Sequence, residues 1–154
     1  MTAQIAMKQG IEVHVLTRGE DARKFALQLG AASARGTYDM PPVKLDSAIN
    51  YTPVGDVVPK AMEALKPGGT LAMAGIHSTD IPQMSYPTHI FHEKNLTSVE
   101  SNTRRDGEEF LTLADRLNIH PEITEYPLEK AADALKYIAK GDIRGACVLR
   151  VSEG

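Results

Sequence analysis

The stretch MTAQIAMKQGIEVHVLTRGE, residues 1–20, decides the fold class. Residues 2–9 have the composition of a helix, and Gly10 can adopt the left-handed conformation that ends one. Residues 11–17 follow as a strand rich in Val and Ile. A helix that leads directly into a strand is the second half of a β–α–β unit. We therefore expect an α/β protein, with the strand and the glycine-rich turn of that unit missing ahead of residue 3.

The rest of the sequence alternates between helices and strands. Apolar residues at helical spacing predict helices over 20–29, 56–65, 103–117 and 128–140, with a short helical piece around 89–93. Runs rich in β-branched and apolar residues predict strands over 31–34, 44–51, 70–76, 95–101, 123–126 and 145–151. Strand 70–76 has almost no polar residue, as expected for a strand buried on both faces. This alternation is typical of a mostly parallel sheet covered by helices.

Two of these helices carry local signals that the structure can test. Thr103 and Asp106 have the spacing of a capping box at the start of helix 103–117. In helix 128–140, the spacing predicts that one apolar face is turned inward, consisting of Leu128, Ala131, Ala132, Leu135 and Ile138.

Composition restricts the possible partners and the compartment. The 154 residues carry a net charge of −3 without a basic cluster, so we expect neither a nucleic acid nor a membrane partner. No apolar run approaches the roughly 18 residues that span a bilayer. Cys147 is the single cysteine, which excludes an intrachain disulfide and agrees with a cytoplasmic location. Its apolar strand predicts a buried, unreactive thiol.

Five stretches in sequence order carry a family resemblance. They are VHVLTRGEDARKFALQLGA (13–31), LDSAINYTPVGDVVPKAMEALKPGG (45–69), PGGTLAMAGIHS (67–78), NLTSVESNTRRDGEEFLTLA (95–114) and PLEKAADALKYIAKGDIRGACVLRV (127–151). Together they resemble the C-terminal half of a medium-chain, zinc-dependent alcohol dehydrogenase, so the chain looks like a C-terminal fragment of such a protein.

The resemblance implies an incomplete Rossmann-type parallel sheet that lacks its first strand and glycine-rich turn. Residues 1–99 correspond to the truncated nicotinamide-cofactor domain, and residues 100–154 to the segment that in the family completes the catalytic domain. The family's zinc ligands, which include cysteines, lie in a part that this chain does not contain. One cysteine cannot replace them. We therefore assign no catalytic residue and no metal ligand to this chain.

The end of strand 11–17 corresponds to the place where the family reads the adenosine ribose. An acidic residue there selects NAD, whereas a small polar residue followed by Arg accommodates the 2′-phosphate of NADP. Thr17 and Arg18 occupy this position and favour NADP. Glu20, close by, leaves NAD open, and Arg18 could instead be a solvated residue in a turn.

Further cofactor contacts are implied by the same resemblance. Gly75 and Ile76 match the strand end beside the nicotinamide, and Ser98 and Val99 match the strand whose main chain meets the carboxamide. Arg144 matches an arginine that contacts the pyrophosphate, and Thr52 follows the end of strand 44–51. Close packing is the alternative explanation for Gly75, and a surface arginine the alternative for Arg144.

His89, His92 and Glu93 could form part of a metal site, since His89 and His92 lie three residues apart on the expected helical piece. No third ligand is identifiable and the family has no metal here, so the sequence favours solvated or capping histidines.

Two functions follow from these observations. In the first, the chain is the cofactor-binding part of an oxidoreductase that interconverts alcohols and aldehydes with NADP or NAD. Alone it is inactive and binds nucleotide weakly. In the second, the chain is a non-catalytic, truncated remnant that folds and self-associates with little nucleotide binding. Whether the chain is itself an enzyme stays open.

The missing strand also has a consequence for assembly. In the Rossmann order it lies between strands 11–17 and 44–51, so its absence leaves unpaired N–H and C=O groups on two facing edges. The sheet could close by pairing these strands directly, or another chain could cover the edges. We expect a homo-oligomer, most simply a dimer.

Overall fold

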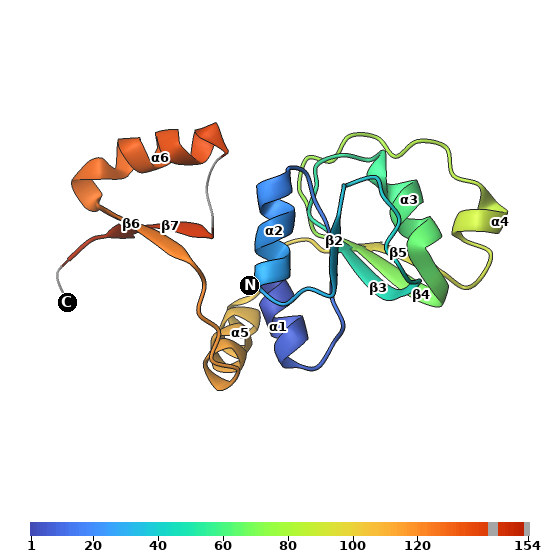
Figure 1. Ribbon diagram of the computed structural model, residues 1–154, viewed down its shortest axis with the longest axis horizontal. Coiled ribbons are helices and arrows are strands. Elements are labelled where there is room, and N and C mark those ends of the chain that lie inside the picture. The colour runs from blue at the N-terminus through green and yellow to red at the C-terminus, as the bar shows by residue number, and fades with distance from the viewer. Residues whose placement is uncertain (142–144, 153–154) are drawn as a thin grey trace. The chain divides into compact units, whose positions relative to one another are not determined.

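The computed structural model describes residues 1–141 and 145–152. The chain divides into two compact units, Thr2–Leu111 and Thr112–Gly154, the second of which also takes Met1. Each unit is α/β (Figure 1). In the described residues, the strands within each unit pair in parallel. The predicted fold class is therefore confirmed. In the described residues, no helix is both long and apolar enough to cross a membrane.

The elements follow the predicted alternation. The first unit contains α1 (Thr2–Lys8), β1 (His14–Leu16), α2 (Glu20–Gln28), β2 (Ser33–Arg35), β3 (Leu45–Asn50), α3 (Val57–Ala64), β4 (Leu65–Met73), α4 (Tyr86–His89) and β5 (Asn95–Ser98). Helix α5 (Arg104–Arg116) crosses the boundary between the units. The second unit continues with β6 (Ile123–Pro127), the 3₁₀ turn η1 (Leu128–Lys130), α6 (Ala131–Lys140) and β7 (Ala146–Arg150).

Several element boundaries differ from the predictions: β1 begins at His14 and not at residue 11, β4 ends at Met73 and not at 76, and β5 ends at Ser98 and not at 101. Two differences are larger. Strand β4 begins at Leu65, directly after α3, and not after the glycine turn at 67–69. Its pairing with β3 shifts register, from Leu45 opposite Leu65 to Ser47 opposite Thr70, so the glycine turn forms an irregularity within the strand. The short helix α4 ends at His89, where the sequence predicted its start. The Ser-Tyr-Pro sequence at 85–87 begins it earlier, with Pro87 in the first turn.

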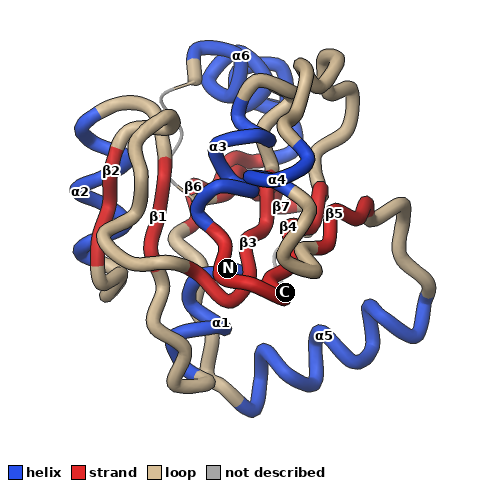
Figure 2. Tube along the Cα trace, turned by 90° about the vertical axis from the view of Figure 1, so that its right-hand side faces the viewer, coloured by secondary structure: helices blue, strands red, loops and turns tan. Residues whose placement is uncertain are grey.

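The strands of the first unit form two separate sheets. Strand β1 pairs with β2, and strands β3, β4 and β5 form a three-stranded sheet in that order. Figure 2 shows β1 beside β2, apart from β3. No backbone pairing joins β1 to β3 in the part of the chain that the structure describes. The sequence left two alternatives for the edges beside the missing strand. The first, direct pairing of β1 with β3, is therefore wrong.

The hydrophobic core of the first unit lies on the three-stranded sheet. Its fully buried side chains are Val58 and Met62 from α3 and Leu65 and Leu71 from β4. Strand β4 is the middle strand, so it has neighbours on both edges as well as α3 against one face. By contrast, α1 has no buried residue.

In the second unit, β6 and β7 form a two-stranded parallel sheet on which α6 packs. The predicted inward face of α6 is wrong: Leu135 is 67% exposed and Ile138 44%, while Ala134 is buried. A sheet only two strands wide covers a narrow strip of the helix, and that strip lies over Ala134. Cys147 is half-buried, so the prediction of a buried thiol is also wrong.

Candidate functional site

The carboxyl ends of β3, β4 and β5 lie in one row. Asn50 pairs with Met73, and Met73 pairs with Ser98, so the three strands end at the same level. Beyond this row the Val99 amide donates to the Met73 carbonyl over 2.9 Å. The edge formed by the carboxyl ends is where parallel α/β sheets bind their ligands.

Five of the residues predicted from the sequence come together at this edge. They are Thr52 after β3, Gly75 and Ile76 after β4, Ser98 at the end of β5, and Val99 directly after it. Ile76 is 77% exposed and Val99 59% exposed, so both present apolar surface. Apolar surface beside a few backbone polar groups is typical of small-molecule binding sites.

Gly75 is fixed by its packing against the end of β3. Its amide donates to the Asn50 carbonyl over 3.2 Å. A Cβ atom at this position would lie 2.9 Å from both the Tyr51 and the Thr52 carbonyl oxygens. Close packing alone therefore requires glycine here, which is the alternative that the sequence left open for this residue.

Thr52 is held by Asn50, a residue that the sequence analysis missed. The Thr52 amide donates to Asn50 Oδ1 over 2.9 Å, and its hydroxyl donates to the same oxygen over 2.8 Å. Asn50 itself is only 8% exposed. The available signal was weak, because β3 also contains Asp46 and Ser47; it was the position of an amide side chain at the carboxyl end of the strand, where burial requires specific partners.

Thr17 and Arg18 lie on the other sheet of the first unit, at the carboxyl end of β1. The Thr17 amide donates to the Arg35 carbonyl over 3.0 Å and so extends the β1–β2 pairing by one residue. Arg18 is exposed in the turn that leads to α2. Glu20, which kept NAD open in the sequence, forms an ion pair with Lys24 at 2.8 Å, one turn further along α2. Arg144 lies outside the described residues.

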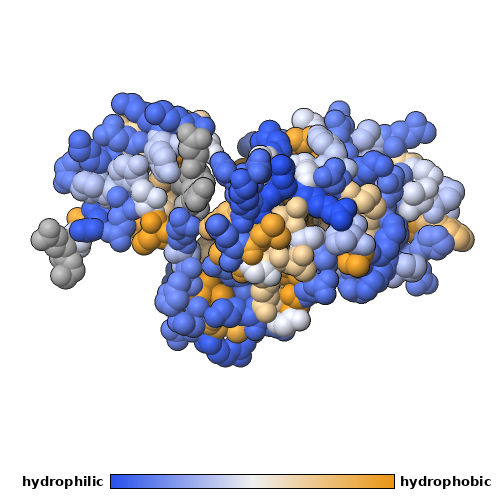
Figure 3. Space-filling model, viewed as in Figure 1, coloured by the Kyte–Doolittle hydropathy of each residue, from blue (hydrophilic) through white to orange (hydrophobic). Residues whose placement is uncertain are grey.

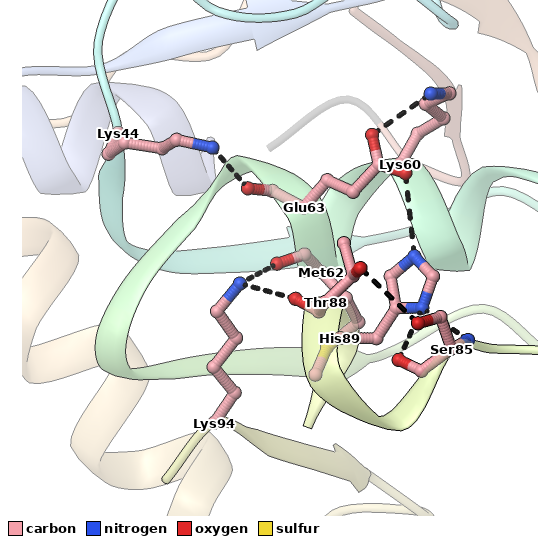
Figure 4. Close-up of polar contacts among 8 residues, drawn as sticks. All are labelled: Lys44, Lys60, Met62, Glu63, Ser85, Thr88, His89 and Lys94. Atoms are coloured by element: carbon pink, nitrogen blue, oxygen red, sulfur yellow. Dashed lines mark hydrogen bonds and ion pairs between the residues drawn. The ribbon is translucent and has the colours of Figure 1, made fainter. Parts of the chain in front are cut away.

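A polar cluster surrounds the carboxyl end of α3 (Figure 4). Lys94 Nζ donates to the Met62 carbonyl over 2.7 Å and to the Thr88 carbonyl over 3.2 Å. Lys44 Nζ donates to the Glu63 carbonyl over 2.6 Å. Carbonyls in the last turn of a helix lack their usual partner within the helix. Lys44 supplies one for Glu63, and Lys94 adds a second donor to the Met62 carbonyl, which also accepts from the Leu65 amide. Burial lowers the pKa of Lys94, and the neighbouring charge of Lys44 lowers it further.

His89 belongs to this cluster and does not face His92. His89 is buried; its Nδ1 accepts from the Ser85 amide over 2.8 Å, and its Nε2 lies 3.4 Å from Glu63 Oε1. Glu63 also bonds Lys60, which is the main reason that the pKa of Glu63 is lowered. His92 is exposed, with its ring 5.2 Å from that of Phe91. Within residues 1–141 and 145–152, no group of three or more His, Cys, Asp or Glu side chains is placed to hold a metal ion.

Comparison with known proteins relates this arrangement to dehydrogenases. A protein named "Probable alcohol dehydrogenase AdhA" from Mycobacterium tuberculosis is 53% identical over 151 residues, which is 98% of this chain and 44% of the mycobacterial protein. The Bacillus subtilis protein yhfP, solved with NAD bound, superimposes with a TM-score of 0.77 at 19% identity. The match covers 97% of this chain and 50% of that one. Escherichia coli YhdH, solved with NADPH bound, gives a TM-score of 0.72 at 20% identity with the same coverage.

The chain thus spans about half the length of these relatives. At 19% and 20% identity the two solved structures show the fold alone, a Rossmann-like α/β fold. The model of one family, described as zinc-binding dehydrogenase, matches residues 1–117. This chain belongs to the zinc-binding dehydrogenase family.

Proposed function

We propose that the chain is the nicotinamide-cofactor part of an alcohol dehydrogenase-type oxidoreductase. The observation that carries this proposal is the convergence of Thr52, Gly75, Ser98 and Val99 at the carboxyl edge of β3, β4 and β5. When bound there, the nicotinamide supplies or accepts the hydride of the reaction. The chain's own residues bind and orient it: Ile76 and Val99 offer apolar surface, and Gly75, which has no side chain, lets the backbone after β4 pack against the end of β3.

NADP is the cofactor we propose, with NAD as the competitor. Arg18 at the end of β1 supplies a guanidinium for a 2′-phosphate, and Thr17 leaves room for that group. The ion pair of Glu20 with Lys24 supports this choice, because it engages the nearest carboxylate that could otherwise accept from the ribose hydroxyls. The proposed cofactor site also includes Arg144.

We propose that the chain alone binds nucleotide weakly and does not turn over an alcohol. The sequence contains no G-x-G-x-x-G turn, whose backbone N–H groups would bind the pyrophosphate. Each such bond to a charged group contributes about 1.5–3 kcal/mol, so we expect a dissociation constant in roughly the millimolar range. The single cysteine likewise leaves the family's zinc ligands to a part that the chain does not contain.

The organisation and assembly of the chain complete the proposal. Residues 1–99 act as the cofactor domain and residues 100–154 as the segment that completes a catalytic domain, in a cytoplasmic protein. The unpaired edges of β1 and β3 support a homodimer. Ile11, which precedes β1, and Ile49, within β3, add apolar surface, since they are 55% and 50% exposed. Figure 3 shows further hydrophobic residues at the visible surface among hydrophilic ones. Sedimentation equilibrium at micromolar concentration tests this part, and a monomer of 16.7 kDa would contradict it.

The test of function is an NMR titration of the purified chain with NADP and with NAD. We expect weak binding of both, tighter for NADP, and loss of that preference in Arg18→Ala. Arg105→Ala, which removes an exposed arginine from α5, is the matched control and should change neither affinity. With zinc, either cofactor and a panel of alcohols, the absorbance of reduced cofactor should stay constant. If the chain binds neither NADP nor NAD, the second hypothesis, a non-catalytic truncated remnant, is favoured.

A further inference from the structure

One buried amide, that of Asn50, organises the junction between β3 and β4. Asn50 and His89 are the polar residues that are buried as whole residues in the described part of the chain, and the side chain of His14 in β1 is 5% exposed. His89 lies in the cluster at the end of α3, whereas Asn50 lies at the carboxyl edge of the sheet, inside the proposed cofactor site. It contacts two of the proposed cofactor residues, Thr52 through its side chain and Gly75 through its backbone.

The directions of the hydrogen bonds around Asn50 follow from the chemistry of the groups. The Thr52 backbone N–H can only donate, and the Asn50 atom 2.9 Å away must therefore be the amide oxygen, Oδ1. The Thr52 hydroxyl lies 2.8 Å from the same oxygen, which cannot donate, so the hydroxyl must donate its only proton. Asn50 Nδ2 then faces the sulfur of Met73 at 3.4 Å, a weak acceptor.

This arrangement limits what Thr52 can offer to a ligand. Because its proton is bound to Asn50, the Thr52 hydroxyl presents only lone pairs, and a ligand that meets it must donate. The nicotinamide end of the cofactor carries suitable donors, the hydroxyls of its ribose and the N–H₂ of its carboxamide.

Asn50 also fixes the backbone that follows β4. Its carbonyl accepts from the Ala74 amide over 2.8 Å and from the Gly75 amide over 3.2 Å. The Cβ position of Gly75 is closed by the carbonyls of Tyr51 and Thr52 at 2.9 Å. Thr52 follows β3 and Gly75 follows β4. Both are hydrogen-bonded to Asn50, so this one residue fixes their positions relative to each other.

We propose that Asn50 is a positioning residue for the nicotinamide end of the cofactor, acting by holding the Thr52 hydroxyl as an acceptor beside Gly75. The inference rests on the proposed function and adds to it a residue that does not itself contact the ligand. It assigns to Thr52 a defined role, acceptance of a hydrogen bond from the ribose or the carboxamide.

A double-mutant cycle tests this proposal, with NMR titration as the measurement. The variants are Asn50→Ala, Thr52→Val and the double variant, and the ligands are NADP and adenosine 2′,5′-bisphosphate, which lacks the nicotinamide and its ribose. Thr52→Val should weaken NADP binding about fivefold, the effect of one hydrogen bond. Asn50→Ala should weaken it at least as much, and the double variant no more than the larger single effect, since both changes remove one interaction. The affinity for the bisphosphate should stay within about twofold.

Met73→Leu is the matched control, because it removes only the sulfur that faces Asn50 Nδ2 and should leave both affinities unchanged. Additive losses in the cycle, or an equal loss of both ligands in Asn50→Ala, would overturn the positioning role and leave the proposed function standing. A wild-type chain that binds neither ligand would overturn both. Thermal unfolding checks that each variant folds. If Asn50→Ala does not fold, Thr52→Val alone is sufficient: an unchanged NADP affinity in that variant overturns the inference.

Discussion

The three-stranded sheet and the two-stranded sheet of the first unit differ in how much they bury. The four largest fully buried side chains, Met62, Leu65, Leu71 and Val58, all belong to α3 and β4. In the region of β1, α2 and β2 the buried hydrophobic residues are the small Ala26 and Ala31, beside the imidazole of His14, which is 5% exposed. A sheet needs a central strand with neighbours on both edges before it can enclose large side chains, and β4 is such a strand while β1 is not.

This difference coincides with a division of the proposed cofactor site. The well-packed sheet carries Thr52, Gly75, Ser98 and Val99, which would meet the nicotinamide end. The less buried sheet carries Arg18, which would meet the adenosine end. Precise positioning is thus available where hydride transfer would occur, and a charge contact, which tolerates more movement, lies where the packing is weaker.

The largest expected effect comes from truncating the core of the three-stranded sheet. Met62 is fully buried in that core, so Met62→Ala should lower the free energy of unfolding by about 2–5 kcal/mol. Leu27 lies on α2 and is 50% exposed, so Leu27→Ala should cost about 0.5 kcal/mol or less. Urea unfolding followed by circular dichroism measures both. Equal losses would show that the two regions are packed alike.

A smaller effect is expected at the junction of the strand ends. Gly75→Ala places a Cβ atom 2.9 Å from two carbonyl oxygens and should cost about 1–3 kcal/mol, because the backbone must move. Gly107 lies within α5 and has no atom within 4 Å of a Cβ built on it. Gly107→Ala should therefore stabilise by about 0.5–1 kcal/mol, through helix propensity. Opposite signs in urea unfolding are the expected result, and stabilisation by both changes would contradict the close packing at Gly75.

The smallest expected effect concerns pH. Lys60, and secondarily His89, hold the pKa of Glu63 below its ordinary value of 4.5. A lowered folded-state pKa contributes stability above 4.5 that is lost as the pH falls through the folded pKa. Glu63→Gln should therefore reduce the difference in unfolding free energy between neutral pH and about pH 3, by up to about 1 kcal/mol. Lys60→Met should give a similar reduction in urea titrations at the two pH values. An unchanged pH dependence in both variants would show that the ion pair contributes nothing.

Features that depend on neighbours along the chain were predictable from the sequence. The alternation of helices and strands follows from apolar spacing and from glycines at the helix ends. The capping box was also predicted: the Thr103 amide donates to Asp106 Oδ2 over 2.7 Å, and the Asp106 amide donates to Thr103 Oγ1 over 3.2 Å. These signals act within one or two turns, so no tertiary contact can reverse them easily.

Features that depend on tertiary contacts were not predictable. The inward face of α6 was wrong because the width of the β6–β7 sheet, not the apolar pattern, decides which strip of the helix is covered. Asn50 was missed because two of its partners, Met73 in β4 and Gly75 after it, lie more than 20 residues away in the sequence. The sequence left open whether β3 pairs directly with β1 or is covered by another chain. Only the observed strand pairing excludes the direct pairing.

The most direct test of the account is an NMR map of amide shifts on titration with NADP. The account predicts that the largest shifts fall at the carboxyl ends of β1, β3, β4 and β5, on Thr17, Arg18, Thr52, Gly75, Ile76, Ser98 and Val99. Amides of β6 in the second unit should change little. Shifts confined to other surfaces, or no shift at saturating NADP, would contradict the claim that these strand ends form a nicotinamide nucleotide site.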